Sequence, residues 1–442
     1  MFSSRSRYRW FVVVAFFLFV LLHQADKLLI SPLTTPIMAT FNINEAQMGA
    51  VSSAAIIVAA VLYPVWGYLY DRYARARLLA LASFIWGSTT WLNALAPSYS
   101  AFLLTRASTG IDDSSYPGMW SLLSDYFGPR MRGKVYGLLQ VAQPLGYMLG
   151  TVLATMLAGT VGWRSVFFMT GGAGILVAAL IFFGVREPQR GQSEPEMANL
   201  AAVAVYRIDR QVALGLLRKR SYLLLISQGF FGVFPWQVLT FWFFRYLEAE
   251  RGYSSDQAMA TMIVAIVALS AGYFLGGVVG DFFFRRTPRG RTLTGMVGVL
   301  AGALFLFLTM NVPLQNRGLF IGFLTLAGIA MSMAAPNVVA TIHDVTEPEV
   351  RSTAQAILSF AENFGSAVAP WLAGVIAVRS SLQVAIIAIC VSTWLVCAAL
   401  FGATSALVPG DISRLRQTMQ ARAEQERSTI ASSGDLPGTL GT

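Results

Sequence analysis

Long apolar stretches separated by short polar segments run along the whole chain. A helix that crosses a membrane needs about 20 predominantly apolar residues, and twelve stretches are long enough. In the first half, the predicted helices cover residues 9–31, 46–70, 78–96, 99–126, 134–158 and 163–185. In the second half, they cover residues 221–247, 255–280, 292–311, 318–343, 352–378 and 381–407. The pattern therefore predicts an all-α membrane protein with twelve transmembrane helices.

A polar segment in the middle of the chain divides the twelve helices into two sets of six. It contains the sequence REPQRGQSEPE, and its later part, from Met197 to Lys219, has the pattern of an amphipathic helix on the membrane surface. We expect an N-terminal six-helix bundle at 1–185, a cytoplasmic linker at 186–220, a C-terminal six-helix bundle at 221–408 and a cytoplasmic tail at 409–442. From about Ser428 onward, the polar composition predicts a disordered tail.

The basic residues predict the orientation in the membrane, because loops rich in Lys and Arg stay in the cytoplasm. If the N-terminus is cytoplasmic, 25 of the 32 Lys and Arg residues fall in cytoplasmic segments. The other seven lie outside or within helices: Arg164, Arg251, Arg317, Arg379, Lys27, Arg106 and Arg245. We therefore predict that both termini are cytoplasmic, in a protein of the bacterial inner (plasma) membrane.

Composition excludes several other classes of protein. The 442 residues are 55% hydrophobic and 12% charged, whereas soluble proteins carry about 25% charged residues. The net charge of +10 does not indicate nucleic-acid binding, because the basic residues form short clusters between apolar runs. Cys390 and Cys397 share one face of an apolar segment, which favours packing over a disulfide or a metal site. The apolar run from Trp10 lacks a small-residue cleavage site, so we expect a first spanning helix there.

The two halves of the chain repeat each other. Gly67, Asp71 and Arg75 follow the second helix with the spacing that Gly277, Asp281 and Arg285 show after the eighth. Five further pairs share an offset of 219 residues: Pro117 and Pro336, Asp125 and Asp344, Pro129 and Pro348, Arg132 and Arg351, and Gly146 and Gly365. Parallel six-helix repeats are typical of transporters whose substrate site lies near the membrane midplane between the halves.

These segments resemble a known family. GYLYDRYARAR at 67–77 resembles the signature between helices 2 and 3 of the major facilitator superfamily, and GVVGDFFFRR at 277–286 resembles its weaker second copy. Similarity to the spinster-like branch, which handles lysophospholipids and sphingolipids, lies in ADK at 25–27, GIDDSSY at 110–116, REPQRG at 186–191 and DVTEPEVRSTAQAI at 344–357. That branch has Asp-Arg in helix 1 and Glu in helix 4, where this chain has Asp26-Lys27 and Asp113. Helix 4, with its YPG, also resembles the organic anion:cation symporters.

The resemblance implies a cytoplasmic gate, in which charge pairs and capped helix ends hold one conformational state. Its expected members are Gly67, Asp71, Arg72, Arg75, Asp281 and Arg285. The alternative is that these residues only set the topology, because any basic cytoplasmic loop obeys the same rule.

Charges inside the predicted helices are the main candidates for chemistry, because charge in hydrocarbon is costly and usually faces a cavity or a partner. Arg106 and Asp113 share one face of helix 4 but differ in height by roughly 10 Å, which is too far to pair. Asp26 in helix 1 reaches the depth of Arg106, which predicts a contact between them. Asp113 is then a candidate proton switch, whereas Asp112 is expected to point elsewhere. The alternative is a fixed structural salt bridge.

Four more polar residues in helices have two readings each. Lys27 binds an anionic substrate or extends to the outer surface. His23 modulates the site or packs in the core. Glu362 and Asn363, near the middle of helix 11, take part in substrate binding or coupling, or make an interhelical hydrogen bond.

Aromatic residues are the candidates for an apolar substrate wall. They are Tyr116 and Trp120 in helix 4, and Phe234, Trp236 and Phe241 in helix 7. Aromatic residues in membrane helices also face lipid or neighbouring helices, so this wall is an expectation with an ordinary alternative.

Together these patterns predict a monomeric secondary transporter that works by alternating access, coupled to protons, and moves a lysolipid-like or sphingolipid-like amphipathic substrate. Two alternatives are a proton-coupled symporter of a small organic anion and a substrate sensor that does not transport. The chain lacks a nucleophile–base set, metal-ligand spacing and a nucleotide loop, so we expect no enzyme activity, no cofactor and no metal. The expected partners are the substrate, protons and membrane lipids.

Overall fold

The computed structural model describes residues 4–127, 129–189, 216–346 and 351–433, and its regular elements there are helices. Those of the first half are α1 (Ser4–Phe41), α2 (Glu45–Arg72), α3 (Arg75–Leu95), α4 (Tyr99–Ser108), α5 (Gly110–Asp113), α6 (Tyr116–Tyr126), α7 (Pro129–Val161) and α8 (Trp163–Gly184). Those of the second half are α10 (Arg220–Ala249), α11 (Ser255–Phe284), α12 (Gly290–Asn311), α13 (Arg317–Ser332), α14 (Ala334–Val345), α15 (Arg351–Arg379) and α16 (Leu382–Ser433).

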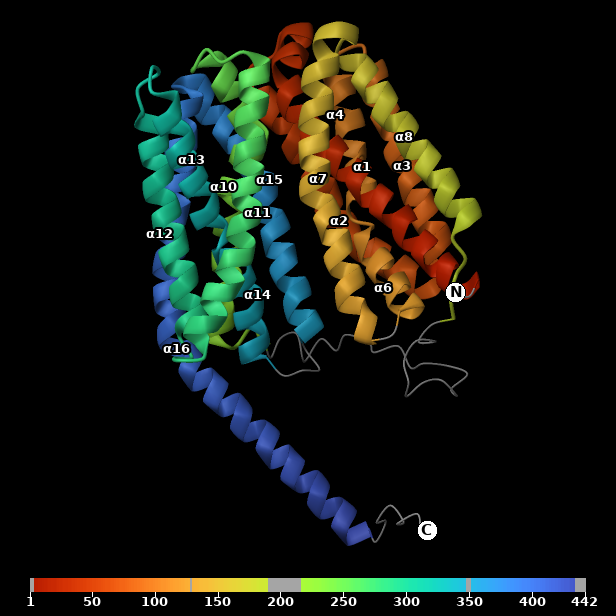
Figure 1. The fold of residues 1–442 in the computed structure, drawn as a ribbon, viewed down its shortest axis with the longest axis vertical. Helices are drawn as coiled ribbons and strands as arrows, with labels where there is room; N and C mark the ends of the chain where they lie inside the picture. Colours follow the sequence, from red (N-terminus) through yellow and green to blue (C-terminus); the bar gives the residue numbers. More distant parts are fainter. Residues whose placement is uncertain (1–3, 128, 190–215, 347–350, 434–442) are drawn as a thin grey trace.

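Eleven helical spans in the described residues are long and apolar enough to cross a membrane. The twelfth predicted helix is the broken series α4, α5 and α6, each of which is too short to cross a membrane alone. Figure 1 shows all of these helices running roughly along the long axis of the molecule. Apolar side chains such as Phe183, Leu176 and Phe274 are 84%, 73% and 73% exposed, which is expected of surfaces that face lipid rather than water.

Two predicted helix ends are wrong. Helix α1 continues to Phe41 through Pro32 and Pro36, ten residues beyond the predicted end. Helix α16 continues through Pro409 to Ser433, so the tail from about Ser428 begins as helix rather than as disordered chain. Proline removes one hydrogen bond, but packed neighbours let membrane helices continue through it. The surface helix predicted from Met197 lies largely outside the described residues, and the domain boundaries stay predictions.

Helix 4 is not one continuous helix, and this break shapes the site. Helix α4 ends at Ser108, the single turn α5 covers Gly110–Asp113, and α6 begins at Tyr116. Gly110 makes the close approach to α2 possible, since a Cβ atom there would lie 2.1 Å from the carbonyl oxygen of Ala55. The second half has a similar break between α13 and α14, at Met333.

The two halves meet most tightly at the end of the molecule that carries Glu45, which we call the Glu45 end. Helix α2 packs on α15 there, so that a Cβ atom at Gly49 would lie 2.5 Å from the Pro370 carbonyl oxygen. Arg245 of α10 binds Glu45 of α2 at 2.8 Å. The opposite end, which carries residues 184–189 and 216–220, is called the linker end. The start of α1 and the end of α16 both lie toward it (Figure 1).

Candidate functional site

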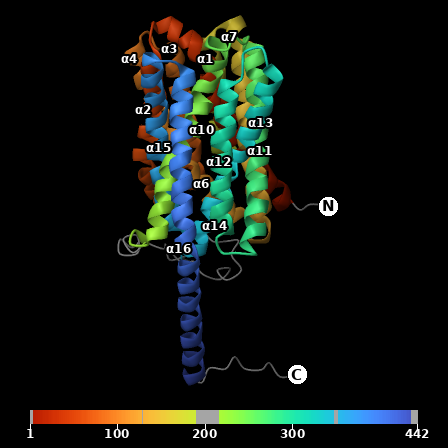
Figure 2. The same cartoon turned by 90° about the vertical axis from the view of Figure 1, so that its left-hand side faces the viewer.

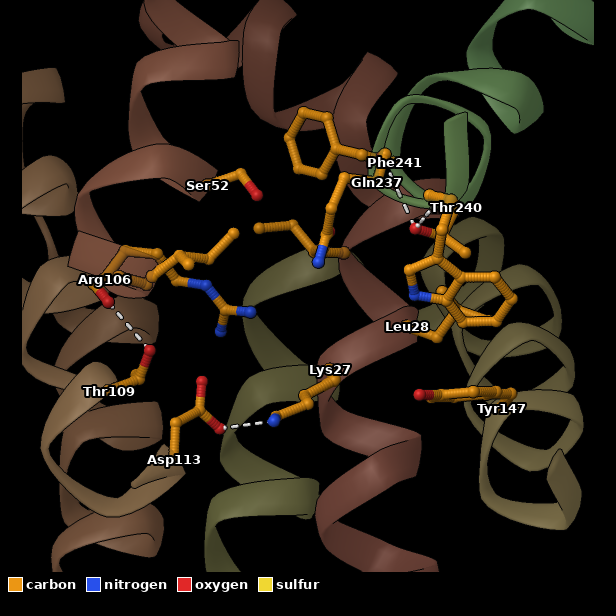
Figure 3. A pocket seen from close by; sticks show the side chains of 14 residues that line it. Lys27, Leu28, Ser52, Arg106, Thr109, Asp113, Tyr147, Gln237, Thr240 and Phe241 are labelled. Atoms are coloured by element: carbon orange, nitrogen blue, oxygen red, sulfur yellow. Dashed lines mark hydrogen bonds and ion pairs between the residues drawn. The ribbon is translucent and has the colours of Figure 1, made fainter. Parts of the chain in front are cut away.

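A cavity of about 180 Å³ lies between the two halves. The first half supplies its walls from α1, α2, the α4–α5 segment and α7, whereas the second half supplies only α10. Its lining residues are Lys27, Leu28, Ile30, Ser52, Ala55, Ile56, Arg106, Thr109, Asp113, Tyr147, Trp236, Gln237, Thr240 and Phe241. Figure 3 shows the guanidinium group of Arg106 and the ammonium group of Lys27 pointing into this space.

Arg106, in the cavity wall, lies close to Asp26, as their depths in the sequence predicted. Arg106 Nη1 is 3.9 Å from Asp26 Oδ2, and both side chains are buried. Asp26 also accepts hydrogen bonds from Thr170 at 2.9 Å and Thr90 at 3.4 Å. Among the described residues, Arg106 Nη1 has no hydrogen-bond partner. The carboxylate of Asp26 is thus held by two hydroxyl groups, while its contact with Arg106 is a longer ion pair.

Lys27 does not extend to the outer surface. Its Nζ atom is 2.9 Å from Asp113 Oδ1, and both residues line the cavity (Figure 3). The ammonium group also lies 5.7 Å from the centroid of the Tyr116 ring. The charge of Lys27 therefore lies at the cavity wall, and its role in binding a substrate stays a prediction.

Asp112, which was expected to point elsewhere than Arg106 and Asp113, does not line the cavity, but its angular position differs from that of a regular helix and it still reaches α1. Asp112 Oδ2 lies 2.7 Å from His23 Nε2, and Asp113 Oδ1 lies 3.3 Å from the same nitrogen. The break between Ser108 and Tyr116 ends the regular 100° rotation per residue on which the prediction relied. Both carboxylates therefore reach α1, although they are adjacent in sequence.

His23 is fully engaged in this network. Its Nδ1 atom is 2.6 Å from the Tyr116 hydroxyl group, which also accepts a hydrogen bond from Gln24 at 2.9 Å. The indole of Trp86 packs edge-on against the imidazole, with centroids 5.3 Å apart. Sequence reasoning underestimated this histidine, although its position one turn before Asp26 on the same helix was a usable signal.

His23, Asp112 and Asp113 also offer three ligand atoms within 4.8 Å of one another, a set that could hold a metal ion. Two contacts already engage these ligand atoms. His23 Nε2 and Asp112 Oδ2 already share a direct hydrogen bond, and the Lys27 ammonium group occupies the open side of Asp113. A cation arriving there would have to displace both.

The predicted aromatic residues divide into two groups. Trp236 and Phe241 line the cavity, and Trp236 also contacts Tyr147, with ring centroids 5.9 Å apart. Tyr116 bonds to His23 behind the cavity wall. The remaining two lie in packed regions: Trp120 against Tyr136 and Phe234 against Phe230. Of the five predicted aromatic residues, the two that line the cavity therefore come from α10, and Tyr147 of α7 lies beside them.

Glu362 and Asn363 are not among the residues that line this cavity. Both are partly buried on α15. A Cβ atom placed on Gly229 of α10 would lie 3.3 Å from Glu362 Cγ, so this glutamate packs along the α10–α15 contact. The structure brings Asp26, Lys27, Arg106, Asp112 and Asp113 together, but not Glu362 with them.

The predicted gate is built around Arg75 at the linker end. The Arg75 side chain is buried and binds Asp125 at 2.7 Å and Glu187 at 2.8 Å. It also donates to the carbonyl and hydroxyl oxygens of Ser121. Arg75 thereby joins the start of α3 to α6 and to the chain after α8. Glu187 is a member that the sequence analysis did not select, although it lies within the REPQRG segment.

The second copy of the gate uses a different arginine. Asp281 binds Arg291 at 2.7 Å, and Arg291 also pairs with Asp344. The expected Arg285 is exposed, and so is Arg72, which contacts Tyr68 on its own helix. Gly67 is partly buried on α2, with open space where a Cβ atom would be. The structure describes the backbone of Asp71 but not its side chain, so its role stays a prediction.

Comparison with known proteins agrees with the architecture. A family model of the Major Facilitator Superfamily matches residues 15–321 and 296–429. A bacterial homologue of the human lysosomal transporter Spinster, in an inward-facing and unoccupied conformation, superimposes with a TM-score of 0.81 at 20% identity. That superposition covers 91% of this chain and 98% of the homologue, and it shows the same fold.

Two curated relatives differ in what their names describe. Protein spinster of Drosophila melanogaster is 28% identical over 386 residues, which cover 85% of this chain but only 63% of the fly protein. The cis,cis-muconate transport protein of Acinetobacter baylyi is 27% identical over 399 residues. This second match covers 86% of this chain and 92% of that protein.

Proposed function

We propose that this chain, which belongs to the major facilitator superfamily and is a transporter of spinster type, carries a small organic anion by alternating access and couples its movement to protons. The anion would bind in the cavity between α1, α2, α4–α5, α7 and α10, with its negative group between Arg106 and Lys27. When the anion binds, Arg106 would release Asp26 and Lys27 would release Asp113.

The observation that carries this proposal is the loose pairing of Arg106, whose guanidinium group points into the cavity but meets Asp26 only at 3.9 Å. A buried guanidinium group normally uses its hydrogen-bonding capacity, because an unsatisfied buried donor costs about 1–3 kcal/mol or more when it is charged. Arg106 Nη1 makes no hydrogen bond within the described residues, since the facing Asp26 oxygen atom is 3.9 Å away, and Arg106 lines the cavity. A substrate carboxylate in the cavity would accept hydrogen bonds from the guanidinium group with the planar geometry that suits arginine.

Size and polarity favour a small anion with an unsaturated or apolar body. Pockets for drug-sized ligands occupy roughly 300–1,000 Å³, whereas this cavity is about 180 Å³. The second half lines the cavity with Trp236, Gln237, Thr240 and Phe241, which form the α10 wall. A conjugated carboxylate would place its charge on the first half and its body against this wall. The muconate transport relative supports the same class of substrate.

A lysolipid-like substrate is the second candidate. The same cations would bind a phosphate group, and the aromatic wall of Trp236 and Phe241 would contact the start of an acyl chain. This candidate requires the acyl chain to leave the cavity toward the linker end. The ion pair that joins the two halves lies at the Glu45 end, so it does not close that path. It predicts that a long apolar tail increases affinity, whereas the first candidate predicts that it prevents entry.

Uptake by purified protein reconstituted in liposomes tests the proposal. We expect saturable uptake of cis,cis-muconate or benzoate that increases with an inward proton gradient and is abolished by a protonophore. Arg106→Gln should remove uptake, whereas the matched variant Arg164→Gln should retain it. Arg164 binds the carbonyl oxygens of Ala94 and Ala96 outside the cavity.

The other outcomes are equally informative. Uptake of a lysophospholipid without uptake of either carboxylate would reject the small-anion proposal in favour of the second candidate. Saturable binding without flux in either direction would identify a sensor rather than a transporter. We also propose that both termini are cytoplasmic and that the membrane is the bacterial inner membrane. Protease access to a C-terminal tag in right-side-out vesicles would contradict this orientation.

A further inference from the structure

The charges around His23 form one closed group behind the cavity. Asp112 and Asp113 face His23 from α5, Tyr116 faces it from α6, and Lys27 lies one turn along α1. Trp86 packs against the ring from α3 and contributes no charge, while Tyr147 of α7 lies at the cavity wall near Lys27. His23 and Asp112 are each only 2% exposed and do not line the cavity.

The charge balance of this region indicates that it binds a proton. Its fixed charges are those of Asp26, Asp112, Asp113, Lys27 and Arg106. With His23 neutral and all three carboxylates ionised, the region carries a net charge of −1. Because an uncompensated charge is expensive inside a membrane protein, one added proton brings the region to neutrality. The hydrogen bond of 2.7 Å between His23 Nε2 and Asp112 Oδ2 is the most deeply buried place where that proton can be shared.

We propose that His23 and Asp112 form a proton-binding site of their own, outside the substrate cavity and connected to it through Asp113. In the loaded state His23 carries protons on both nitrogens, donating from Nε2 to Asp112 and from Nδ1 to the Tyr116 oxygen. In the unloaded state the Tyr116 hydroxyl group turns to donate to Nδ1. Asp113 spans the two regions, since one oxygen atom, Oδ1, lies 2.9 Å from Lys27 Nζ and 3.3 Å from His23 Nε2.

This site gives anion binding a route to proton uptake, an inference that rests on the proposed function above. An anion that pairs with Lys27 leaves Asp113 without its cation and returns the region to a net charge of −1. A second proton then enters from the cavity to Asp113, while the first stays with His23 and Asp112. Proton uptake should therefore accompany the binding of each anionic charge, and the stored proton should hold His23 in its loaded state.

Transport assays test the site in the full chain. For His23→Gln and Asp112→Asn, we expect the ratio of gradient-driven accumulation to counterflow to fall at least tenfold, because counterflow needs no net proton movement. Ser83→Ala is the matched control, since Ser83 is equally buried in the same half but donates only to the Gly174 carbonyl oxygen. An unchanged ratio in both site variants would overturn the inference. Absence of carboxylate counterflow in the wild type would instead reject the proposed function.

A spectroscopic measurement tests the site without any transport. The chain contains two histidines, His23 and His343, so His343→Gln leaves His23 as the single imidazole. With ¹⁵N-labelled histidine in the purified protein, we expect signals of a doubly protonated ring between about pH 5 and 8, the range over which histidine ordinarily changes charge. Adding Asp112→Asn should shift or abolish that form. A neutral single tautomer throughout the range would overturn the proton site, whatever the substrate is.

Discussion

The two six-helix halves share a fold but differ in their chemistry. In the first half, α1 and the broken series α4–α6 bring three carboxylates, two cations and a histidine into one buried region. In the second half, α13 and α14 break at the corresponding place, yet Thr325 and Ser332 occupy the positions that match Arg106 and Asp113. The second half contributes the aromatic wall of α10 instead. A repeated architecture thus fixes where helices bend, while the residues at the bend decide which half handles charge.

The ion pairs at the linker end also differ between the two halves. Asp125 and Asp344 are repeat partners, and each receives an arginine. In the first half the arginine is Arg75, which is buried and bound to two carboxylates. In the second half it is Arg291, which lies farther along the chain than the expected Arg285. Its side chain is 17% exposed, against 3% for Arg75. The repeat preserves the acceptor, but the longer turn before α12 changes the donor.

The largest expected difference between the two halves is the effect of substituting Arg106 on uptake. Arg106→Gln removes the proposed anion ligand and leaves Asp26 buried without its cation, a loss of about 2–5 kcal/mol for such pairs. We expect carboxylate uptake into liposomes to fall at least 100-fold. Thr325→Gln at the repeat position should change uptake much less. Equal losses in the two variants would contradict the assignment of charge handling to the first half.

The contribution of the linker-end arginines to the free energy of unfolding should also differ between the halves. Arg75→Ala leaves Asp125 and Glu187 without their cation in a buried place, so we expect the free energy of unfolding to fall by about 3 kcal/mol. Arg291→Ala, in a more exposed setting, should lower it by about 1 kcal/mol. Thermal unfolding of the detergent-purified variants measures both, with Arg289→Ala as an exposed control. A larger loss from Arg291→Ala would reverse the ranking.

The ion pair between Arg245 and Glu45 connects the halves at the Glu45 end, and it should have a moderate effect. Partly exposed pairs contribute about 0.2–1 kcal/mol, so Glu45→Gln should favour opening of that end by about 1.4- to fivefold. Labelling of a cysteine introduced at Ser52, in the cavity wall, with an impermeant reagent applied from the Glu45 end measures this shift. Arg245→Gln should have the same effect, and the double variant should add little to either single change.

The smallest expected effect is at Glu362. This residue packs beside Gly229 and is absent from the cavity wall, so Glu362→Gln should alter the pH dependence of uptake by less than about twofold. Asp113→Asn, in the same assay, should remove most of that dependence. A large change from Glu362→Gln would place a coupling carboxylate in the second half and would end the division of roles described above.

Much of the architecture could be predicted from periodicity and repeat spacing, because a membrane accepts few backbone structures. The number of spanning helices, the two-half repeat and the depth at which Asp26 meets Arg106 follow from residue counts along regular helices. The predicted helix ends were wrong where a helix continues through a proline. The helix ends beyond Pro32 and Pro409 depend on neighbours that supply packing, and no local pattern encodes them.

The sequence by itself determined that buried charges lie in helices 1 and 4, because few other residues of that kind occur within apolar runs. Only the tertiary structure decided which of them meet. The break at Gly110–Ser115 turns both Asp112 and Asp113 toward α1, so that Lys27 pairs with Asp113 and His23 with Asp112. The angular position of a side chain can be counted from the sequence only while the helix is continuous. Here the helix is interrupted, and α5 approaches α2 closely at Gly110.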